Sequence, residues 1–208
     1  MKSSELLLPL QHAPWNRGRL LGPKPPLKPR YIWEIRMRLK LAKRVRDLAM
    51  FDLAIDSKLR GCDLVRLRVD DVVLHGAVKS RATVQQSKTR RPVHFEITEQ
   101  ARSALAKWIE RLDRQEGFLF PSRTDPGRPL TTRQYSRLVH QWVGLIGLDP
   151  SAYGTHSLRR TKASLIYKRT GNLRAVQLLL GHTKIESTVR YLGIEVDDAL
   201  AISEQTEI

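Results

Sequence analysis

Near the C-terminal end of the chain, residues 155–161 read THSLRRT. His156 and Arg159 lie three positions apart, so a helix places them on one face. A helix that Thr155 caps also puts both side chains in its first turn, where free backbone N–H groups and the positive end of the helix dipole favour an anion. The stretch therefore predicts a helix whose first turn can hold a phosphate, although one H-x-x-R pair by itself is a weak signal.

A second motif follows at residues 179–182, which read LLGH, and Tyr191 comes nine positions after His182. Gly181 predicts the end of one helix, and Thr183, with a glutamate three residues later, predicts a capping box at the start of the next. On one unbroken helix, nine residues would separate His182 from Tyr191 by roughly 13 Å, so both can serve one site only if the helix breaks. The alternative interpretation is a buried histidine and a packing tyrosine.

The net charge of the chain indicates a polyanionic partner. Its 208 residues include 37 Lys and Arg against 21 Asp and Glu, a formal charge of +16, and the isoelectric point is near 10.5. Residues 1–46 account for +10 of this charge, since they hold 12 basic and two acidic residues. Such an excess is typical of proteins that neutralise backbone phosphates, although it does not specify which polyanion is bound. A solvated basic arm that only aids solubility is the alternative.

Length and composition suit a single domain. With 41% hydrophobic residues, the chain can bury the core of one domain of about 150–180 residues and carry an extension. Cys62 is the single cysteine, which excludes an intramolecular disulfide, and its apolar neighbours favour a place in the core over a role as nucleophile. No apolar run approaches the roughly 18 residues of a membrane span. We therefore expect a cytoplasmic protein without a membrane partner.

The pattern along the chain predicts an α+β fold that is mainly helical. Residues 1–30 combine prolines with basic side chains, a composition that blocks helix and predicts a flexible arm. β-prone pieces between residues 72 and 97 predict a small three-stranded antiparallel sheet. Residues 196–208 are acidic and amphipathic, and predict a C-terminal tail helix. Helical spacing or capping signals predict the remaining elements, at residues 31–42, 44–55, 61–67, 98–114, 131–146, from 155, 173–180 and from 183.

Four separated motifs resemble those of the tyrosine recombinases, the phage-integrase family, in order and spacing. They are LRGCDLVRL at residues 59–67, QSKT at 86–89, HSLR at 156–159, and LLGH at 179–182 with Tyr191. The resemblance covers about residues 40–195. It implies the tyrosine-recombinase catalytic fold for residues 31–195, in a catalytic-domain-only member that lacks the separate DNA-clamping domain most members carry before it.

The resemblance also implies a chemical role for each matching residue. Tyr191 would attack the scissile phosphate and form a 3′-phosphotyrosyl link, while Arg60 and Arg159 would bind the non-bridging oxygens. Guanidinium suits this task because it is always charged and bidentate. His156 would assist proton transfer from the tyrosine, and His182 would hydrogen-bond the phosphate.

Two further residues complete the expected site. Lys88, on the hairpin turn, would protonate the 5′-oxygen of the leaving strand, although Lys79 or Arg90 could reach the site instead. Asp63 resembles the acidic residue that orients the site from behind, here an aspartate where glutamate is common. Because arginines neutralise the charge and one phosphodiester is exchanged for another, we expect neither a metal nor a cofactor.

Site-specific recombination of double-stranded DNA is the leading hypothesis. The alternatives are DNA relaxation in the manner of a type IB topoisomerase and a non-catalytic DNA-binding regulator on the same scaffold. The resemblance implies a homotetramer on paired sites at the nucleoid, and the lack of a clamping domain suggests an accessory DNA-bending protein. The tail would dock on a neighbouring protomer or fold back on its own domain. We also expect the site to be incompletely assembled without DNA.

Overall fold

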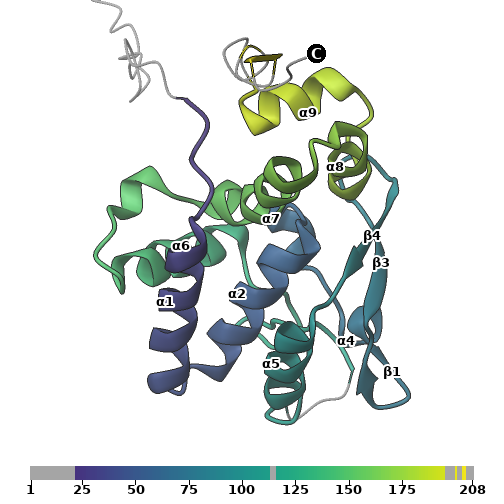
Figure 1. Cartoon of the computed structure of the whole chain (residues 1–208). Coiled ribbons are helices and arrows are strands. Elements are labelled where there is room, and N and C mark those ends of the chain that lie inside the picture. Colours follow the sequence, from purple (N-terminus) through teal and green to yellow (C-terminus); the bar gives the residue numbers. More distant parts are fainter. Residues whose placement is uncertain (1–21, 113–115, 195–199, 201–202, 205–208) are drawn as a thin grey trace, which may run out of the picture.

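The computed structural model describes residues 22–112, 116–194, 200 and 203–204 (Figure 1). Helices dominate, as the sequence predicts, and the strands are short. In chain order the elements are α1 (Pro29–Leu41), α2 (Val45–Ser57), α3 (Gly61–Leu64), α4 (Val69–Val72), β1 (Val73–Leu74), β2 (Ala77–Val78), β3 (Arg81–Gln85), β4 (Pro92–Glu96), α5 (Glu99–Ile109), α6 (Thr132–Gly144), the 3-10 helix η1 (Pro150–Ala152), α7 (Thr155–Thr170), α8 (Leu173–Leu180) and α9 (Ile185–Leu192).

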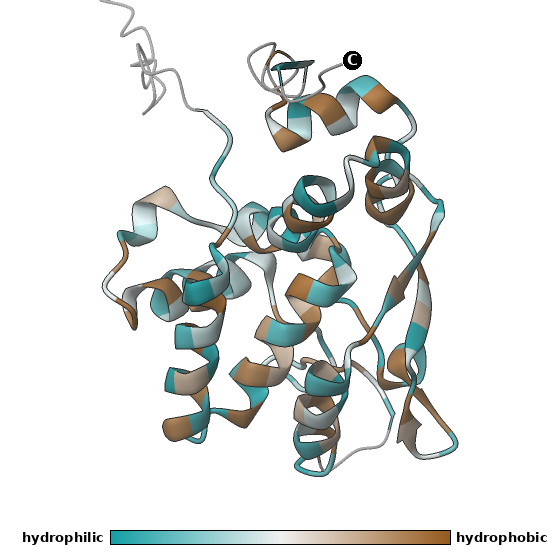
Figure 2. Ribbon diagram, viewed as in Figure 1, coloured by the Kyte–Doolittle hydropathy of each residue, from teal (hydrophilic) through white to brown (hydrophobic). Residues whose placement is uncertain are grey.

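Helix α2 lies at the centre of the main core, where it packs against α1, α5 and α7 (Figure 1). The core is one cluster of buried residues that runs from Leu27 to Leu158. Within it, Phe51 on α2 meets Trp142 on α6 edge to face, with ring centroids 5.6 Å apart. Figure 2 shows hydrophobic and hydrophilic residues alternating along α1 and α5, whose apolar faces supply part of this core. The main core therefore fixes the end of α2 and the start of α7.

The strands form two separate hairpins, which corrects the predicted three-stranded sheet. β1 pairs with β2 and β3 pairs with β4, both antiparallel. His75 and Gly76 have φ of 50° and 77°, the conformation of a two-residue hairpin turn, so β1 folds back at once on the short strand β2. Val72, expected in a strand, belongs to α4. The paired residues of the second hairpin run from Arg81↔Glu96 to Gln85↔Pro92.

Local capping differs from the sequence prediction at two helices. The N-cap of α7 is Gly154, whose N–H donates to Ser157 Oγ at 3.2 Å, so Thr155 is the first helical residue rather than the cap. Helix α9 begins without a side-chain cap, so the predicted Thr183 capping box does not form. In both cases the helix itself lies where the sequence predicts it.

Helices α8 and α9 pack around a second, smaller hydrophobic cluster. Its buried members are Ala163, Val176 and Leu180. The partly buried residues that pack against them are Ile166, Tyr167, Tyr191 and Leu192. In Figure 1, α9 lies at one end of the molecule, beyond α7 and α8. The predicted nucleophile, Tyr191, therefore packs against this smaller cluster and not against the main core.

The end of the predicted arm packs against the domain. Leu27 is 2% exposed and belongs to the main core, and its N–H donates to Thr161 Oγ1 at 2.9 Å. Helix α1 then begins at Pro29, whose fixed φ suits the first helical turn. The rest of the arm, residues 1–21, and most of the predicted tail helix lie outside the described residues. Within the described part of the chain, no helix has the length and apolar composition to cross a membrane.

Candidate active site

Arg159 is held inside the protein by two backbone carbonyls. The residue belongs to α7 and is 3% exposed. Its Nη2 donates to the carbonyl oxygen of Leu180 at 2.8 Å, and its Nη1 donates to that of Lys58. Lys58 caps the end of α2 in the left-handed conformation, at φ 53°. The guanidinium is therefore fixed between the ends of α2 and α8, and its burial lowers the pKa of Arg159.

Arg60 reaches the same carbonyl through a buried amide. It stands at the N-cap of α3, and its Nη1 donates to Oε1 of Gln86. Gln86 is fully buried, and its Nε2 donates to the carbonyl oxygen of Leu180 at 3.2 Å. That oxygen also accepts from Arg159. The structure thus brings the two predicted arginines together, although they lie far apart in the sequence.

Tyr191 and His182 face each other across the break between α8 and α9. Their ring centroids are 5.4 Å apart and their planes meet at 82°. The Cζ atoms of Arg159 and Arg160 lie 5.8 and 4.8 Å from the centroid of the Tyr191 ring. His182 Nδ1 lies 3.1 Å from Thr188 Oγ1, a hydrogen bond that orients the imidazole. The tyrosine hydroxyl is buried and has no hydrogen-bond partner among the described residues.

Burial, and after it the charges of the nearby arginines, sets the protonation of the site. Burial, together with the charges of Arg159 and Arg60, lowers the pKa of His182 to about 4. Partial burial of its ring and the charges of nearby arginines also lower the pKa of His156. Burial raises the pKa of Tyr191, against the opposing charges of two arginines. At neutral pH both imidazoles are therefore neutral, and the phenol keeps its proton.

Two of the predicted site residues lie at its rim. His156 is in the first turn of α7, as predicted, and is exposed at the surface. Lys88 is exposed on the turn at residues 87–89, between β3 and β4. Arg159 lies against Tyr191, and Gln86 and the Leu180 carbonyl link it to Arg60. Within the described part of the chain, the Lys88 side chain hydrogen-bonds none of these residues.

The turn that carries Lys88 is anchored on both sides of that residue. The Ser87 N–H donates to Asp63 Oδ1 at 2.9 Å, and Thr89 Oγ1 donates to Gln86 Oε1 at 2.9 Å. Asp63 is 5% exposed, and its Oδ2 has no hydrogen-bond partner within the described residues. The aspartate thus lies behind the site, where it holds the backbone of the lysine turn.

A tyrosine beside two gathered arginines and a neutral histidine is the arrangement that the family resemblance implies. Residues 34–196 match the model of the phage integrase family. The chain belongs to this family.

Solved structures of tyrosine recombinases share the fold of this phage-integrase member. A crystal structure of XerA recombinase matches with a TM-score of 0.71 at 19% identity, over 89% of this chain and 66% of that one. A structure of XerH recombinase bound to a palindromic difH substrate, after cleavage, matches with a TM-score of 0.67 at 19% identity, over 87% and 54%. At these identities the likeness concerns the fold, which is the tyrosine-recombinase catalytic fold.

Curated relatives of this phage-integrase chain are recombinases by name. The probable integrase/recombinase YoeC of Bacillus subtilis (strain 168) is 31% identical over 171 residues, which cover 82% of this chain and 89% of that protein. The tyrosine recombinase XerD of Xanthomonas axonopodis pv. citri (strain 306) is 32% identical over 161 residues, 71% of this chain and 50% of that protein. The chain thus spans most of YoeC and about half the length of the XerC and XerD relatives it matches.

The integrase motifs mark the charged residues of the site but not the groups that hold them. No motif assigns a role to Gln86, Arg160 or Thr188, although each contacts a predicted site residue. Arg160 directly follows Arg159 in the sequence. Adjacent residues on a helix point to different faces, so no sequence pattern places both arginines at one site. A buried amide gives no periodic signal, and backbone carbonyls such as that of Leu180 are common to every residue.

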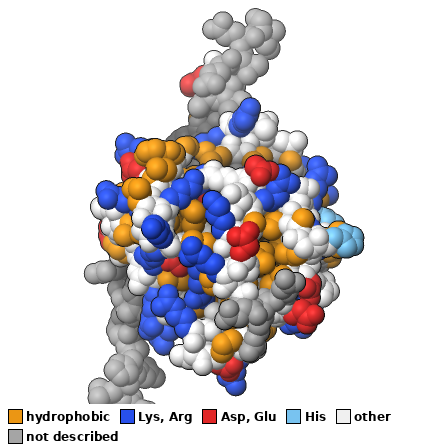
Figure 3. All heavy atoms as spheres, turned by 90° about the horizontal axis from the view of Figure 1, so that it is seen from below, with side chains coloured by type: hydrophobic (Ala, Val, Ile, Leu, Met, Phe, Trp, Pro, Cys, Tyr) orange, Lys and Arg blue, Asp and Glu red, His pale blue; other side chains and the backbone are white. Residues whose placement is uncertain are grey.

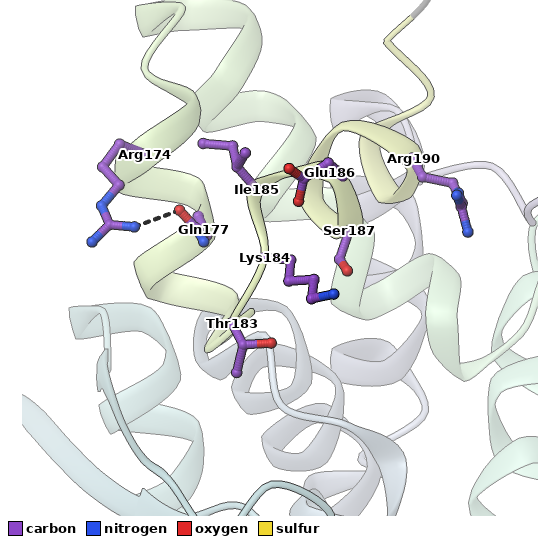
Figure 4. A pocket seen from close by; sticks show the side chains of 8 residues that line it. All are labelled: Arg174, Gln177, Thr183, Lys184, Ile185, Glu186, Ser187 and Arg190. Carbon is purple, nitrogen blue, oxygen red and sulfur yellow. Dashed lines mark hydrogen bonds between the residues drawn. The ribbon is translucent and has the colours of Figure 1, made fainter.

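A cleft of about 810 Å³ between α8 and α9 adjoins the site. Gln177, in its wall, donates from Nε2 to the carbonyl oxygen of His182 at 3.2 Å, so cleft and site share a boundary. The basic side chains among the lining residues suit an anion. The lining residues, drawn in Figure 4, are Arg174, Gln177, Thr183, Lys184, Ile185, Glu186, Ser187 and Arg190.

The face of the molecule opposite α9 lies at the bottom of Figure 1 and is seen from below in Figure 3. Figure 3 shows basic, acidic and hydrophobic side chains interspersed on it. As for metals, the described residues contain no group of three or more His, Cys, Asp or Glu side chains placed to hold an ion.

Proposed function

We propose that this phage-integrase chain cleaves and rejoins double-stranded DNA at specific sites through a 3′-phosphotyrosyl intermediate. The observation that carries the proposal is the link between Arg60 and Arg159, in which Gln86 accepts from Arg60 and shares the Leu180 carbonyl with Arg159, while Tyr191 lies against Arg159. Two fixed guanidinium groups beside one phenol are what a phosphodiester needs for binding and for covalent attack.

The arginines would stabilise the charge that grows on the non-bridging oxygens in the transition state. Arg159 is held by two carbonyls and Arg60 by a buried amide. Such groups do not have to reorganise during the reaction, which is why preorganised donors are effective. Arginine also keeps its charge when buried, unlike lysine, so neither position would tolerate lysine without loss.

The chemical step exchanges one phosphodiester for another. The Tyr191 oxygen attacks the phosphorus, the bond from phosphorus to the 5′-oxygen breaks, and the tyrosine becomes joined to the 3′-phosphate. The phenolic proton passes to neutral His156 or through it to water, and the 5′-oxygen leaves with a proton from Lys88. A 5′-hydroxyl then attacks the phosphotyrosine and restores the tyrosine, so no energy-rich cofactor is consumed.

Neutral His182 would donate to the phosphate rather than exchange protons. Its pKa of about 4 keeps the ring uncharged at neutral pH. When Thr188 donates to Nδ1, the remaining ring hydrogen is on Nε2 and is free to hydrogen-bond a phosphate oxygen. The Thr188 hydroxyl would therefore select the tautomer that the site uses.

Lys88 remains the best candidate for the general acid. One of the two alternatives, Lys79, donates to the carbonyl oxygens of Asp70 and Asp71 at 2.8 and 3.2 Å, which ties it to α4. Lys88 instead stands on the turn that Asp63 and Gln86 attach to the site. An exposed lysine on such a turn can reach a DNA backbone laid over the arginines.

Double-stranded DNA is the partner that this chemistry requires. The net charge of +16 and the basic cleft between α8 and α9 support it. Solved relatives include XerH on difH DNA and a lambda integrase dimer on a core site. From the family resemblance we also propose that the chain acts as a homotetramer on paired sites, with the help of an accessory DNA-bending protein.

A nicked DNA substrate that traps the covalent complex tests the proposal. The wild-type chain should form a protein–DNA adduct that survives denaturation, and Tyr191→Phe should form none while it still binds DNA. The substitution removes only the hydroxyl and leaves the ring in the cluster around α8 and α9, so the melting temperature should change little. Supercoiled plasmid that is relaxed without recombinant product would favour topoisomerase-like relaxation, and DNA binding without any adduct would favour a regulator.

A further inference from the structure

We propose that Gln86 is a positioning residue that aligns Arg60 with Arg159 and with the lysine turn. The inference rests on the proposed function of the same site. Gln86 lies directly after β3, at the point where the hairpin reaches α3 and α8. Its side chain is fully buried, so its polar atoms depend on protein partners.

The Gln86 amide joins three of the motifs of the family at once. Oε1 accepts from Arg60 Nη1 in the first motif and from Thr89 Oγ1 in the lysine turn. Nε2 donates to the Leu180 carbonyl oxygen in the LLGH motif, the oxygen that also holds Arg159. A single side chain thus determines the spacing of the two guanidinium groups.

The packing around Gly181 shows how closely the chain must approach this amide. A Cβ atom at Gly181 would lie 3.1 Å from Gln86 Nε2 and 2.6 Å from Val93 Cγ2, and the glycine has φ of 64°. Both the space and the backbone conformation therefore require glycine there. His182 directly follows Gly181 in the chain, so the position of Gln86 also limits where the backbone of His182 can lie.

An amide is the side chain that this place needs, because it both accepts and donates. Glutamate would keep the acceptor for Arg60 but lose the donor for the Leu180 carbonyl. Methionine has a similar length and would lose all three hydrogen bonds of the amide, to Arg60, Thr89 and the Leu180 carbonyl, while it still fills the space. A positioning role and a packing role therefore predict opposite orders for the two substitutions.

We expect cleavage to be fastest in the wild type, slower in Gln86→Glu and slowest in Gln86→Met. Release of the Arg60 guanidinium should slow cleavage of the nicked substrate roughly 100-fold in Gln86→Met and roughly 10-fold in Gln86→Glu, as for other displacements of about 1 Å in an active site. DNA affinity should change little. The matched control is Gln85→Ala, which removes an exposed neighbouring amide that donates to the Arg90 carbonyl, and this variant should cleave like wild type.

A packing role would give the opposite order, with Gln86→Met faster than Gln86→Glu, and would overturn the proposal. Thr89→Val provides a milder variant, because it removes only the hydroxyl that fixes the amide orientation and should slow cleavage a few-fold without unfolding. NMR signals of the Arg60 guanidinium give a second readout that does not depend on activity. They should be distinct in wild type and Gln86→Glu and averaged by free rotation in Gln86→Met.

These readouts separate the two proposals. If the wild-type chain forms no adduct, the proposed function fails, while the guanidinium signals still test Gln86. If the wild type forms the adduct and Gln86→Met cleaves equally fast, only the role of Gln86 fails.

Discussion

The arginines and the tyrosine of the candidate site stand in parts of the molecule with very different support. Arg60 precedes α3, and Arg159 on α7 is held by the Lys58 carbonyl at the end of α2 and the Leu180 carbonyl at the end of α8. The end of α2 and the start of α7 belong to the main core of residues 27–158. Tyr191 is on α9, a helix of eight residues that packs against a cluster with three buried hydrophobic residues. The arginines are therefore supported by the main core, whereas the tyrosine is supported by the smaller cluster.

This difference fits what the proposed reaction requires of the arginines and of the tyrosine. Charge stabilisation benefits from groups that do not move. The proposed nucleophile has to approach a phosphorus atom instead, and a small shift of α9 would move the Tyr191 oxygen toward it. Segments with few buried apolar contacts open at low free energy, so α9 is the part of the site best able to make that shift. Assembly of the site on DNA remains a prediction.

The largest expected effect concerns the arginines. Replacing Arg159 by Met should slow cleavage of the nicked substrate by roughly 10² to 10³, the usual loss for one preorganised donor. It should also lower the melting temperature, since the buried carbonyls of Lys58 and Leu180 lose their donor. Arg169→Met, on the exposed end of the same helix, is the control. If Arg159→Met cleaved the substrate as fast as the wild-type chain, the proposed role of Arg159 in stabilising the phosphate charge would be contradicted.

Hydrogen exchange compares the main core and the smaller cluster directly. Amides of α9 should exchange through openings at least about 2 kcal/mol cheaper than those of α2, because local opening of a small cluster costs less than global unfolding. Val176→Ala should speed exchange in α9 and leave α2 unchanged. Val139→Ala, in the main core, should instead speed exchange in both. Equal protection of α9 and α2 in the wild type would show that the two clusters unfold together.

The smallest expected effect is a pH dependence that comes from His182. Folding lowers its pKa from 6.5 to about 4, so between these values the unfolded chain binds more protons. The free energy of unfolding should therefore fall as the pH drops from about 6.5 to 4. We expect a loss of about 1 to 2 kcal/mol, less than the full shift, because the half-buried ring keeps contact with water.

Denaturant unfolding at several pH values measures this loss. In His182→Asn the side-chain amide can still bond Thr188, and the fall in stability at low pH should be smaller than in wild type. Part of it should remain, since the pKa of His156 is also lowered. An unchanged pH dependence in His182→Asn would show that His182 does not cause the loss of stability at low pH.

The elements that the sequence predicts well are those set by near neighbours. Asn172 and Gly181 bound α8 as expected, because a cap or a left-handed stop depends on atoms a few residues away. The predicted three-stranded sheet fails for the opposite reason, since strand pairing depends on which distant segment is available. The expected Thr183 cap also fails, because the entry into α9 follows the packing of that helix on α8.

The sequence by itself determined the charge, the order of the motifs and the residue types that a phosphodiester reaction needs, since these are properties of single side chains and of helical spacing. Only the tertiary structure decided that Arg60 and Arg159 share the Leu180 carbonyl through Gln86 and that the pKa of His182 falls to about 4. Burial and the distance between charges are set by residues far apart in the chain, so no local pattern encodes them.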